Sequence, residues 1–92
     1  LVLGGGGLLI LFTGALESMS RKEAQQRVVE LGGEAPSGVT RELDYLVIGD
    51  ADFEKFSGGW RTSKLKKADD YNASGSNIQV VGESAFLEMV GK

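Results

Sequence analysis

Four residues on two stretches of the chain have the groups that a phosphate-binding site needs: Thr13, Gly14, Arg21 and Lys64. Thr13 offers a hydroxyl group, and Gly14 lets an anion approach the backbone N–H closely. The guanidinium of Arg21 can contact two phosphate oxygens at once, and Lys64 supplies a compact positive charge. A fold that brings the four together would create a site for one phosphate group.

Each of the four residues also has an ordinary structural explanation. Thr13 would end a strand, Gly14 would form a turn, and the two basic residues would be solvated surface charges. For any one of them alone, this explanation is the better one. Their combination reverses the preference, because ligands of open α/β sheets bind at the carboxyl ends of strands, beside helix N-termini.

Positive charge is concentrated in one short segment of an acidic chain. The segment holds Arg61, Lys64, Lys66 and Lys67, whereas the whole chain has a net charge of -3. This distribution favours a local anion site over a basic surface that coats DNA. A solvated helix face is the alternative interpretation of the lysine run taken by itself.

Three residues in or beside this segment are additional candidate DNA contacts: Arg61, Lys67 and Trp60. Arg61 and Lys67 would add positive charge next to Lys64. Trp60 could stack on a terminal base. It could equally anchor its own loop, and we favour the anchor.

One continuous apolar run and two mainly apolar segments predict the strands of a buried parallel sheet. They cover residues 8–12, 44–48 and 78–81. Residues 34–36 can form only a short additional strand, and an edge position suits it because Pro36 has no N–H to donate.

Helices are expected at residues 20–31, 62–71 and 83–90. The first begins with a capping box, in which Ser20 and Glu23 each accept a hydrogen bond from the other's backbone amide. Gly32 and Gly33 end this helix, and one of the two should adopt a left-handed backbone conformation. The stretch of residues 49–59 is expected to be a loop.

The predicted order of elements is β-α-β-β-α-β-α. Strands that alternate with helices favour an α/β fold, in which helices cover both faces of a parallel sheet. The length of 92 residues fits one domain. We expect that domain to cover residues 8–92, after a glycine-rich linker or domain boundary at residues 1–7.

The composition excludes several kinds of chemistry. The chain has no cysteine and no histidine, which excludes Ser-His triads, thiol nucleophiles, disulfide scaffolds and the usual zinc sites. The acidic residues 50–54 do not form a calcium loop, because Lys55 stands where the loop needs a glycine. We therefore expect no catalytic residues, no metal and no cofactor. The apolar run at residues 8–12 is too short to span a bilayer.

Taken together, the motifs of residues 8–90 resemble those of BRCT domains. The matching motifs are Phe12-Thr13-Gly14-x-Leu16, Arg21-x-Glu23-Ala24, Gly32-Gly33, Asp44-Tyr45-Leu46-Val47-x-Gly49, Ser63-Lys64-x-x-Lys67-Ala68 and Ile78-x-Val80-Val81-x-Glu83-x-x-Phe86-Leu87. The resemblance is greatest to the BRCT domains of bacterial NAD-dependent DNA ligases, of the clamp-loader large subunit and of polymerase-associated exonucleases.

The resemblance implies a four-stranded parallel sheet in the order 2-1-3-4, flanked by three helices. It also implies that Thr13, Gly14 and Lys64 form an anion pocket. Arg21 matches the additional arginine of the members that bind a 5′ phosphate of DNA. The implied function is a non-catalytic module of a DNA replication or repair protein, which binds DNA bearing a 5′ phosphate at a nick or a recessed end.

Two other functions stay open. The same pocket could dock a phosphopeptide or another protein, although phosphopeptide readers usually work as tandem pairs and this chain holds one repeat. Alternatively, the domain could be a structural interaction module whose pocket is unused. In each case we expect a monomeric domain without a membrane partner, located with the nucleoid in the cytoplasm of a bacterium or in the nucleus of a eukaryote.

Overall fold

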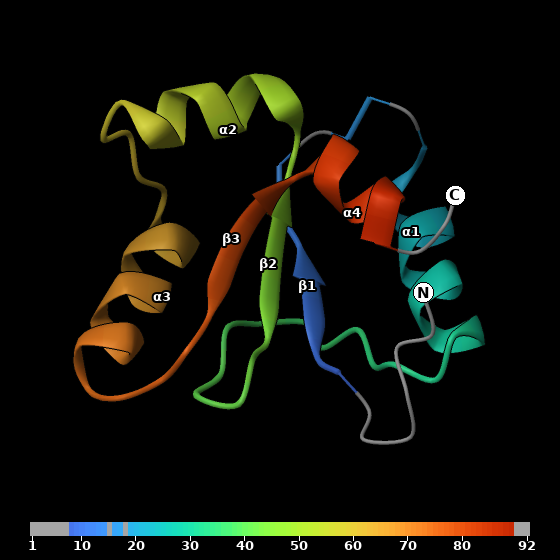
Figure 1. The fold of residues 1–92 in the computed structure, drawn as a ribbon, viewed down its shortest axis with the longest axis horizontal. Helices are drawn as coiled ribbons and strands as arrows, with labels where there is room; N and C mark the ends of the chain where they lie inside the picture. The colour runs from blue at the N-terminus through green and yellow to red at the C-terminus, as the bar shows by residue number, and fades with distance from the viewer. Residues whose placement is uncertain (1–7, 15, 18, 90–92) are drawn as a thin grey trace.

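The computed structural model describes residues 8–14, 16–17 and 19–89, and it shows one sheet with helices around it (Figure 1). The elements are β1 (Ile10–Phe12), α1 (Arg21–Glu30), β2 (Tyr45–Ile48), α2 (Asp50–Ser57), α3 (Ser63–Ala73), β3 (Gln79–Gly82) and α4 (Glu83–Met89). The linker predicted at residues 1–7 and the end of the last predicted helix, at Val90, lie outside the described residues.

The described strands form a parallel sheet in the order β1-β2-β3. In the register of this sheet, Leu11 lies opposite Leu46, which lies opposite Val80. Helices α1 and α4 lie on one side of the sheet, α3 lies on the other side, and α2 crosses above its carboxyl edge (Figure 1). The prediction of a parallel sheet with helices on both faces is therefore confirmed.

Alternating residues of β1 divide the core between the two faces. Ile10 and Phe12 pack in the cluster with α1 and α4, where the Phe12 and Phe86 rings meet edge to face with their centroids 4.9 Å apart. Leu11 packs in the other cluster, together with Leu65 of α3. A strand with both faces covered needs apolar side chains at every position, which explains the unbroken apolar run in the sequence.

The fourth strand predicted at residues 34–36 is not confirmed, because the sheet of the described residues has three strands. Glu34 makes a single parallel bridge with Leu9, through hydrogen bonds from the Ile10 amide to the Glu34 carbonyl (2.9 Å) and from the Glu34 amide to the Leu8 carbonyl (2.8 Å). Pairing ends there because Pro36 cannot donate the next ladder hydrogen bond. The chain thus reaches the edge of β1 without forming a full strand.

The loop predicted at residues 49–59 is wrong, because most of it forms α2. As a result, the described elements follow the order β-α-β-α-α-β-α, with four helices in place of three. Asp50 and Asp52 lie in the first turn of α2, where negative charge interacts favourably with the helix dipole. Phe53 and Phe56 are one turn apart and pack together against the core on the α3 side, and this contact compensates for the shortness of the helix.

The predicted helix boundaries hold at α1. The Ser20 hydroxyl accepts a hydrogen bond from the Glu23 amide at 3.1 Å, and the Glu23 carboxylate accepts one from the Ser20 amide at 3.4 Å, which confirms the capping box. Of the two glycines after the helix, Gly32 has the left-handed conformation, with φ of +90°. At α3, the helix extends to Ala73, two residues beyond its predicted end.

Candidate functional site

The first part of the candidate site is the turn after β1. The Thr13 amide donates to the Val47 carbonyl at 3.0 Å, so Thr13 stays attached to the carboxyl edge of the sheet. Gly14 comes next, exposed and in the left-handed region with φ of +77°. A residue with a side chain would be strained in this conformation, so the turn requires glycine where an anion would approach the backbone.

Arg21 lies beside this turn. It is the first residue of α1, and its Nη2 donates a hydrogen bond to the Gly14 carbonyl at 3.1 Å. The guanidinium group has five N–H donors in a planar fork, so this single bond leaves donors for an external anion. The structure therefore brings together two of the predicted site residues, seven positions apart in the sequence.

Lys64 lies in the first turn of α3 and is half-buried. The Thr62 hydroxyl caps this helix by accepting a hydrogen bond from the Leu65 amide at 3.3 Å. The Lys64 ammonium group has no hydrogen bond or ion pair to any residue that the structure describes. Both α1 and α3 begin on the side of the sheet where the strands end (Figure 1), so Lys64 lies at the same end of the molecule as Thr13 and Gly14.

Arg61 is held by the protein itself. Its Nε bonds the Asp69 carboxylate at 2.7 Å, and its Nη1 donates to the carbonyls of Phe56 and Trp60 at 2.8 and 2.9 Å. The guanidinium carbon also lies 4.0 Å from the centroid of the Phe56 ring. These contacts join the end of α2 to α3, which makes Arg61 a structural residue in this conformation.

Trp60 and Lys67, the other two candidate DNA contacts, have looser surroundings. The Trp60 side chain is 39% exposed, and the Lys55 ammonium lies 5.6 Å from its ring centroid. The Trp60 amide donates to the Lys55 carbonyl at 3.0 Å, as expected of a residue that anchors its own segment. Lys67 is exposed, with its ammonium 5.8 Å from the centroid of the Tyr71 ring.

Asp52 is a residue of this edge that the sequence reasoning missed. A Cβ placed on Gly14 would lie 2.6 Å from the Asp52 Oδ2 atom, so the carboxylate lies directly against the Gly14 backbone. Asp52 is half-buried, and its side chain makes no hydrogen bond or ion pair within the described part of the chain. The sequence contains no signal for this contact, because it depends on α2 being a helix.

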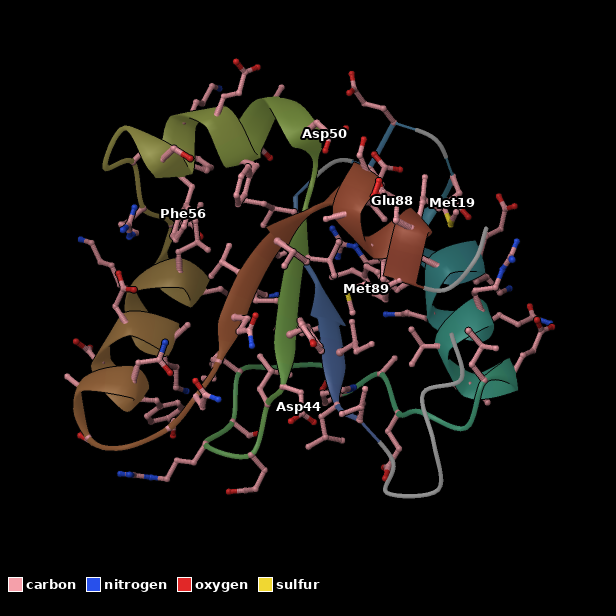
Figure 2. The ribbon with its side chains drawn as sticks, viewed as in Figure 1. Met19, Asp44, Asp50, Phe56, Glu88 and Met89 are labelled. Atoms are coloured by element: carbon pink, nitrogen blue, oxygen red, sulfur yellow. The ribbon has the colours of Figure 1, made fainter. Side chains whose placement is uncertain are left out.

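Asp50, two residues earlier, has a different environment. Its carboxylate accepts hydrogen bonds from the Ser84 amide (3.1 Å) and the Ser84 hydroxyl (2.5 Å), and it lies beside the start of α4 (Figure 2). The hydrogen bond from the Ser84 hydroxyl, together with the weaker effect of that from the Ser84 amide, lowers the pKa of Asp50 below its ordinary value. Asp50 therefore stabilises the junction between α2 and α4 in its ionised form.

Glu83 is a second residue with a supporting position. It begins α4 and is only 2% exposed. Its Oε1 accepts a hydrogen bond from the Glu17 amide at 2.8 Å, which ties α4 to the turn between Gly14 and Arg21. The Glu83 motif was visible in the sequence, but its contact with residue 17 was not.

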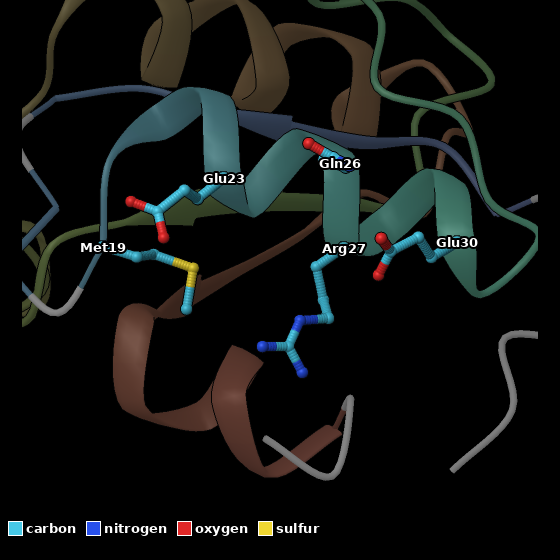
Figure 3. A pocket seen from close by; sticks show the side chains of 5 residues that line it. All are labelled: Met19, Glu23, Gln26, Arg27 and Glu30. Atoms are coloured by element: carbon cyan, nitrogen blue, oxygen red, sulfur yellow. The ribbon is translucent and has the colours of Figure 1, made fainter.

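A depression of about 210 Å³ lies elsewhere, along α1. Its lining consists of Met19, Glu23, Gln26, Arg27 and Glu30, and Figure 3 shows Met19 and Arg27 pointing toward α4. None of the predicted site residues lines it. With two carboxylates and one guanidinium, this depression has no charge preference for a phosphate.

The described part of the chain contains no cluster of three or more potential metal ligands. Within the same residues, no helix is long and apolar enough to cross a membrane. The side chains at the carboxyl edge instead offer hydrogen-bond donors and charges on a small, fixed α/β scaffold.

This scaffold is that of a small α/β domain built on a parallel sheet. The chain belongs to the BRCT family: residues 7–90 match the family described as the BRCA1 C Terminus (BRCT) domain. A BRCT domain is a non-catalytic module, which confirms the prediction that the domain itself is not an enzyme.

Several bacterial proteins named DNA ligase are similar to this chain. That of Syntrophus aciditrophicus is 40% identical over 86 residues, which are 94% of this chain and 11% of the relative. That of Coprothermobacter proteolyticus is 38% identical over 84 residues, or 91% of this chain and 10% of the relative. The chain thus spans about a tenth of the length of these relatives, and it is homologous to their BRCT regions.

Proposed function

We propose that this BRCT domain binds DNA bearing a 5′ phosphate, at a nick or a recessed end, and that Thr13, Gly14, Arg21 and Lys64 hold the phosphate. The observation that carries the proposal is the hydrogen bond from Arg21 to the Gly14 carbonyl. It holds a guanidinium beside a turn that contains the exposed Gly14. Phosphate groups favour such a combination of planar and backbone donors.

The state of Lys64 also supports the proposal. An ammonium group at the start of a helix experiences the positive end of the helix dipole, which is an unfavourable place for a lysine without a counter-ion. Lys64 lacks a carboxylate partner among the described residues, whereas Arg61 on the same segment has Asp69. An external phosphate would supply the missing negative charge.

The similarity to DNA ligases supports a DNA ligand and a ligase as the parent protein, in preference to an exonuclease or a clamp-loader subunit. In a bacterium, such a protein would work in the cytoplasm on the nucleoid. The sequence that flanks this domain tests the assignment of the parent protein. A ligase would have an adenylation region there, whereas an exonuclease or clamp-loader region would contradict the assignment.

A phosphopeptide is the second candidate ligand, because the same four residues could hold a phosphoserine. Titration of the domain with a 5′-phosphorylated nicked duplex and with a phosphoserine peptide, followed by fluorescence anisotropy, separates the two. We expect the duplex to bind more tightly, since it adds contacts with neighbouring phosphates to the terminal one. Tighter binding of the peptide would overturn the DNA proposal.

A further inference from the structure

We infer that Asp52 is a specificity-determining residue of the proposed phosphate site, where its carboxylate opposes the entry of the phosphate and limits the affinity. This inference rests on the proposed function, because it concerns the same pocket. It starts from the close approach of the Asp52 Oδ2 atom to Gly14, where an added Cβ would lie only 2.6 Å from that oxygen.

The position of Asp52 is set by α2 and by the attachment of α2 to the rest of the domain. The first turn of α2 is fixed through the hydrogen bonds between Asp50 and Ser84, and its aromatic side chains pack on the α3 side of the core. Asp52 lies in the same turn. The helix backbone therefore holds Asp52 next to Gly14.

The two carboxylates of this turn differ in what compensates their charge. Asp50 has two hydrogen bonds from Ser84. The Asp52 carboxylate has no hydrogen-bonding or ion-pairing partner in the part of the chain that the structure describes. A phosphate oxygen that reaches the Gly14 backbone would therefore meet the negative charge of Asp52 at close range.

The size of this effect follows from the Coulomb interaction of charges near a protein surface. Two unit charges about 4 Å apart interact by about 1 kcal/mol in water and by more where the protein excludes water. Removal of the Asp52 charge should therefore raise the affinity for a 5′-phosphorylated duplex by about five- to tenfold at low salt. The gain should shrink as the salt concentration rises, because both charges are accessible to counter-ions.

The test compares Asp52→Asn with Glu54→Gln, which removes one negative charge from the same helix at an exposed position. Fluorescence anisotropy with 5′-phosphate and 5′-hydroxyl duplexes is recorded for the parent and both variants, after thermal melting has shown that each is folded. We expect Asp52→Asn to increase the preference for the phosphate, and Glu54→Gln to leave that preference near the parent value.

Each outcome has a defined meaning for the two claims. If the parent prefers the 5′-phosphate duplex and Asp52→Asn increases this preference no more than Glu54→Gln does, the role of Asp52 is overturned. The proposed function then still stands. If only the Asp52→Asn variant prefers the 5′-phosphate duplex, the role of Asp52 is supported. The proposed function of the parent domain is then overturned. Equal binding of both duplexes by the parent and both variants overturns both claims.

Discussion

The turn after β1 and the turn after β2 lie at the same edge of the sheet, yet they present opposite charges. The first carries the Thr13 hydroxyl, the exposed Gly14 and the Arg21 guanidinium. The second carries the carboxylates of Asp50 and Asp52 at the start of α2. The comparison shows that the charge at this edge depends on the residues at the start of the helix that follows each strand, and not on the net charge of the chain.

The two turns also differ in how they are supported. The β1–α1 turn depends on α4, since Glu83 accepts a hydrogen bond from the Glu17 amide at 2.8 Å. The β2–α2 turn itself supports α4, since Asp50 accepts hydrogen bonds from Ser84. Helix α4 thus connects the donor turn to the acidic turn through two consecutive residues.

The largest expected effect concerns this connection. Glu83→Ala should lower the free energy of unfolding by about 2–3 kcal/mol, because it removes a buried hydrogen-bond acceptor and leaves the Glu17 amide without it. Urea unfolding measures the loss. Glu88→Ala, an exposed change on the same helix, serves as the control and should cost much less. Equal stability of the two variants would show that the donor turn does not depend on α4.

The next effect concerns Lys64. Because a charge-assisted contact is worth about 1.5–3 kcal/mol, Lys64→Ala should weaken binding of a 5′-phosphorylated duplex by about ten- to a hundredfold. Lys66→Ala removes an exposed charge two positions away on the same helix and should have a smaller effect. Anisotropy titrations measure both. Similar losses for the two variants would mean that Lys64 acts only through the general charge of α3.

The acidic turn should show its role in the pH dependence of stability. The folded-state pKa of Asp50 is lowered from its ordinary value of 3.8, so its contribution is fully present above that value and is lost as the pH falls through the folded pKa. Asp50→Ala should cost about 1–2 kcal/mol at neutral pH, as loss of a helix-capping carboxylate does. The stability of the Asp50→Ala variant should then fall less than that of the parent as the pH is lowered.

Thermal melting between pH 7 and pH 2 measures this difference. Ser84→Ala is the matched variant, since it removes the hydroxyl partner of Asp50 and keeps the carboxylate. The melting temperature of this variant should fall less than that of the parent at low pH, but more than that of Asp50→Ala. If the melting temperatures of Asp50→Ala and the parent fall equally as the pH is lowered, the structural role of Asp50 is contradicted.

The smallest expected effect is that of Thr13→Ala. The hydroxyl group would supply one neutral hydrogen bond, so its loss should cost about 0.5–1.5 kcal/mol of binding energy, or about two- to tenfold in affinity. The Thr13 amide, which bonds the Val47 carbonyl, remains in the variant. A loss larger than that of Lys64→Ala, measured by the same titration, would reverse the proposed ranking of the donors.

Much of the fold could be predicted because its signals are local. The apolar runs identify β1, β2 and β3, and the capping box marks the start of α1 at Ser20. Helix α2 escaped prediction because Gly49 offers no side chain to cap it, and its apolar contacts amount to one pair of aromatic residues. The edge strand was overestimated because the ladder ends before Pro36, after one bridge at Glu34.

The residues of the candidate site also divide into those that local sequence signals reveal and those that they do not. Thr13, Gly14, Arg21 and Lys64 could be proposed from the sequence because they stand at the ends of recognisable strands and helices. Asp52 and Glu83 could not be connected to the site, because their contacts join residues that are 38 and 66 positions apart. Contacts at such separations depend on how the elements pack, and no local pattern encodes them.

The most direct test of the account is the affinity of the parent domain for two nicked duplexes that differ only in the 5′ group at the nick. With the phosphate at this position, the duplex should bind about ten- to a hundredfold more tightly than its 5′-hydroxyl counterpart, because the charge-assisted contacts with Arg21 and Lys64 need the terminal phosphate. Equal affinities for the two duplexes would contradict the proposed function.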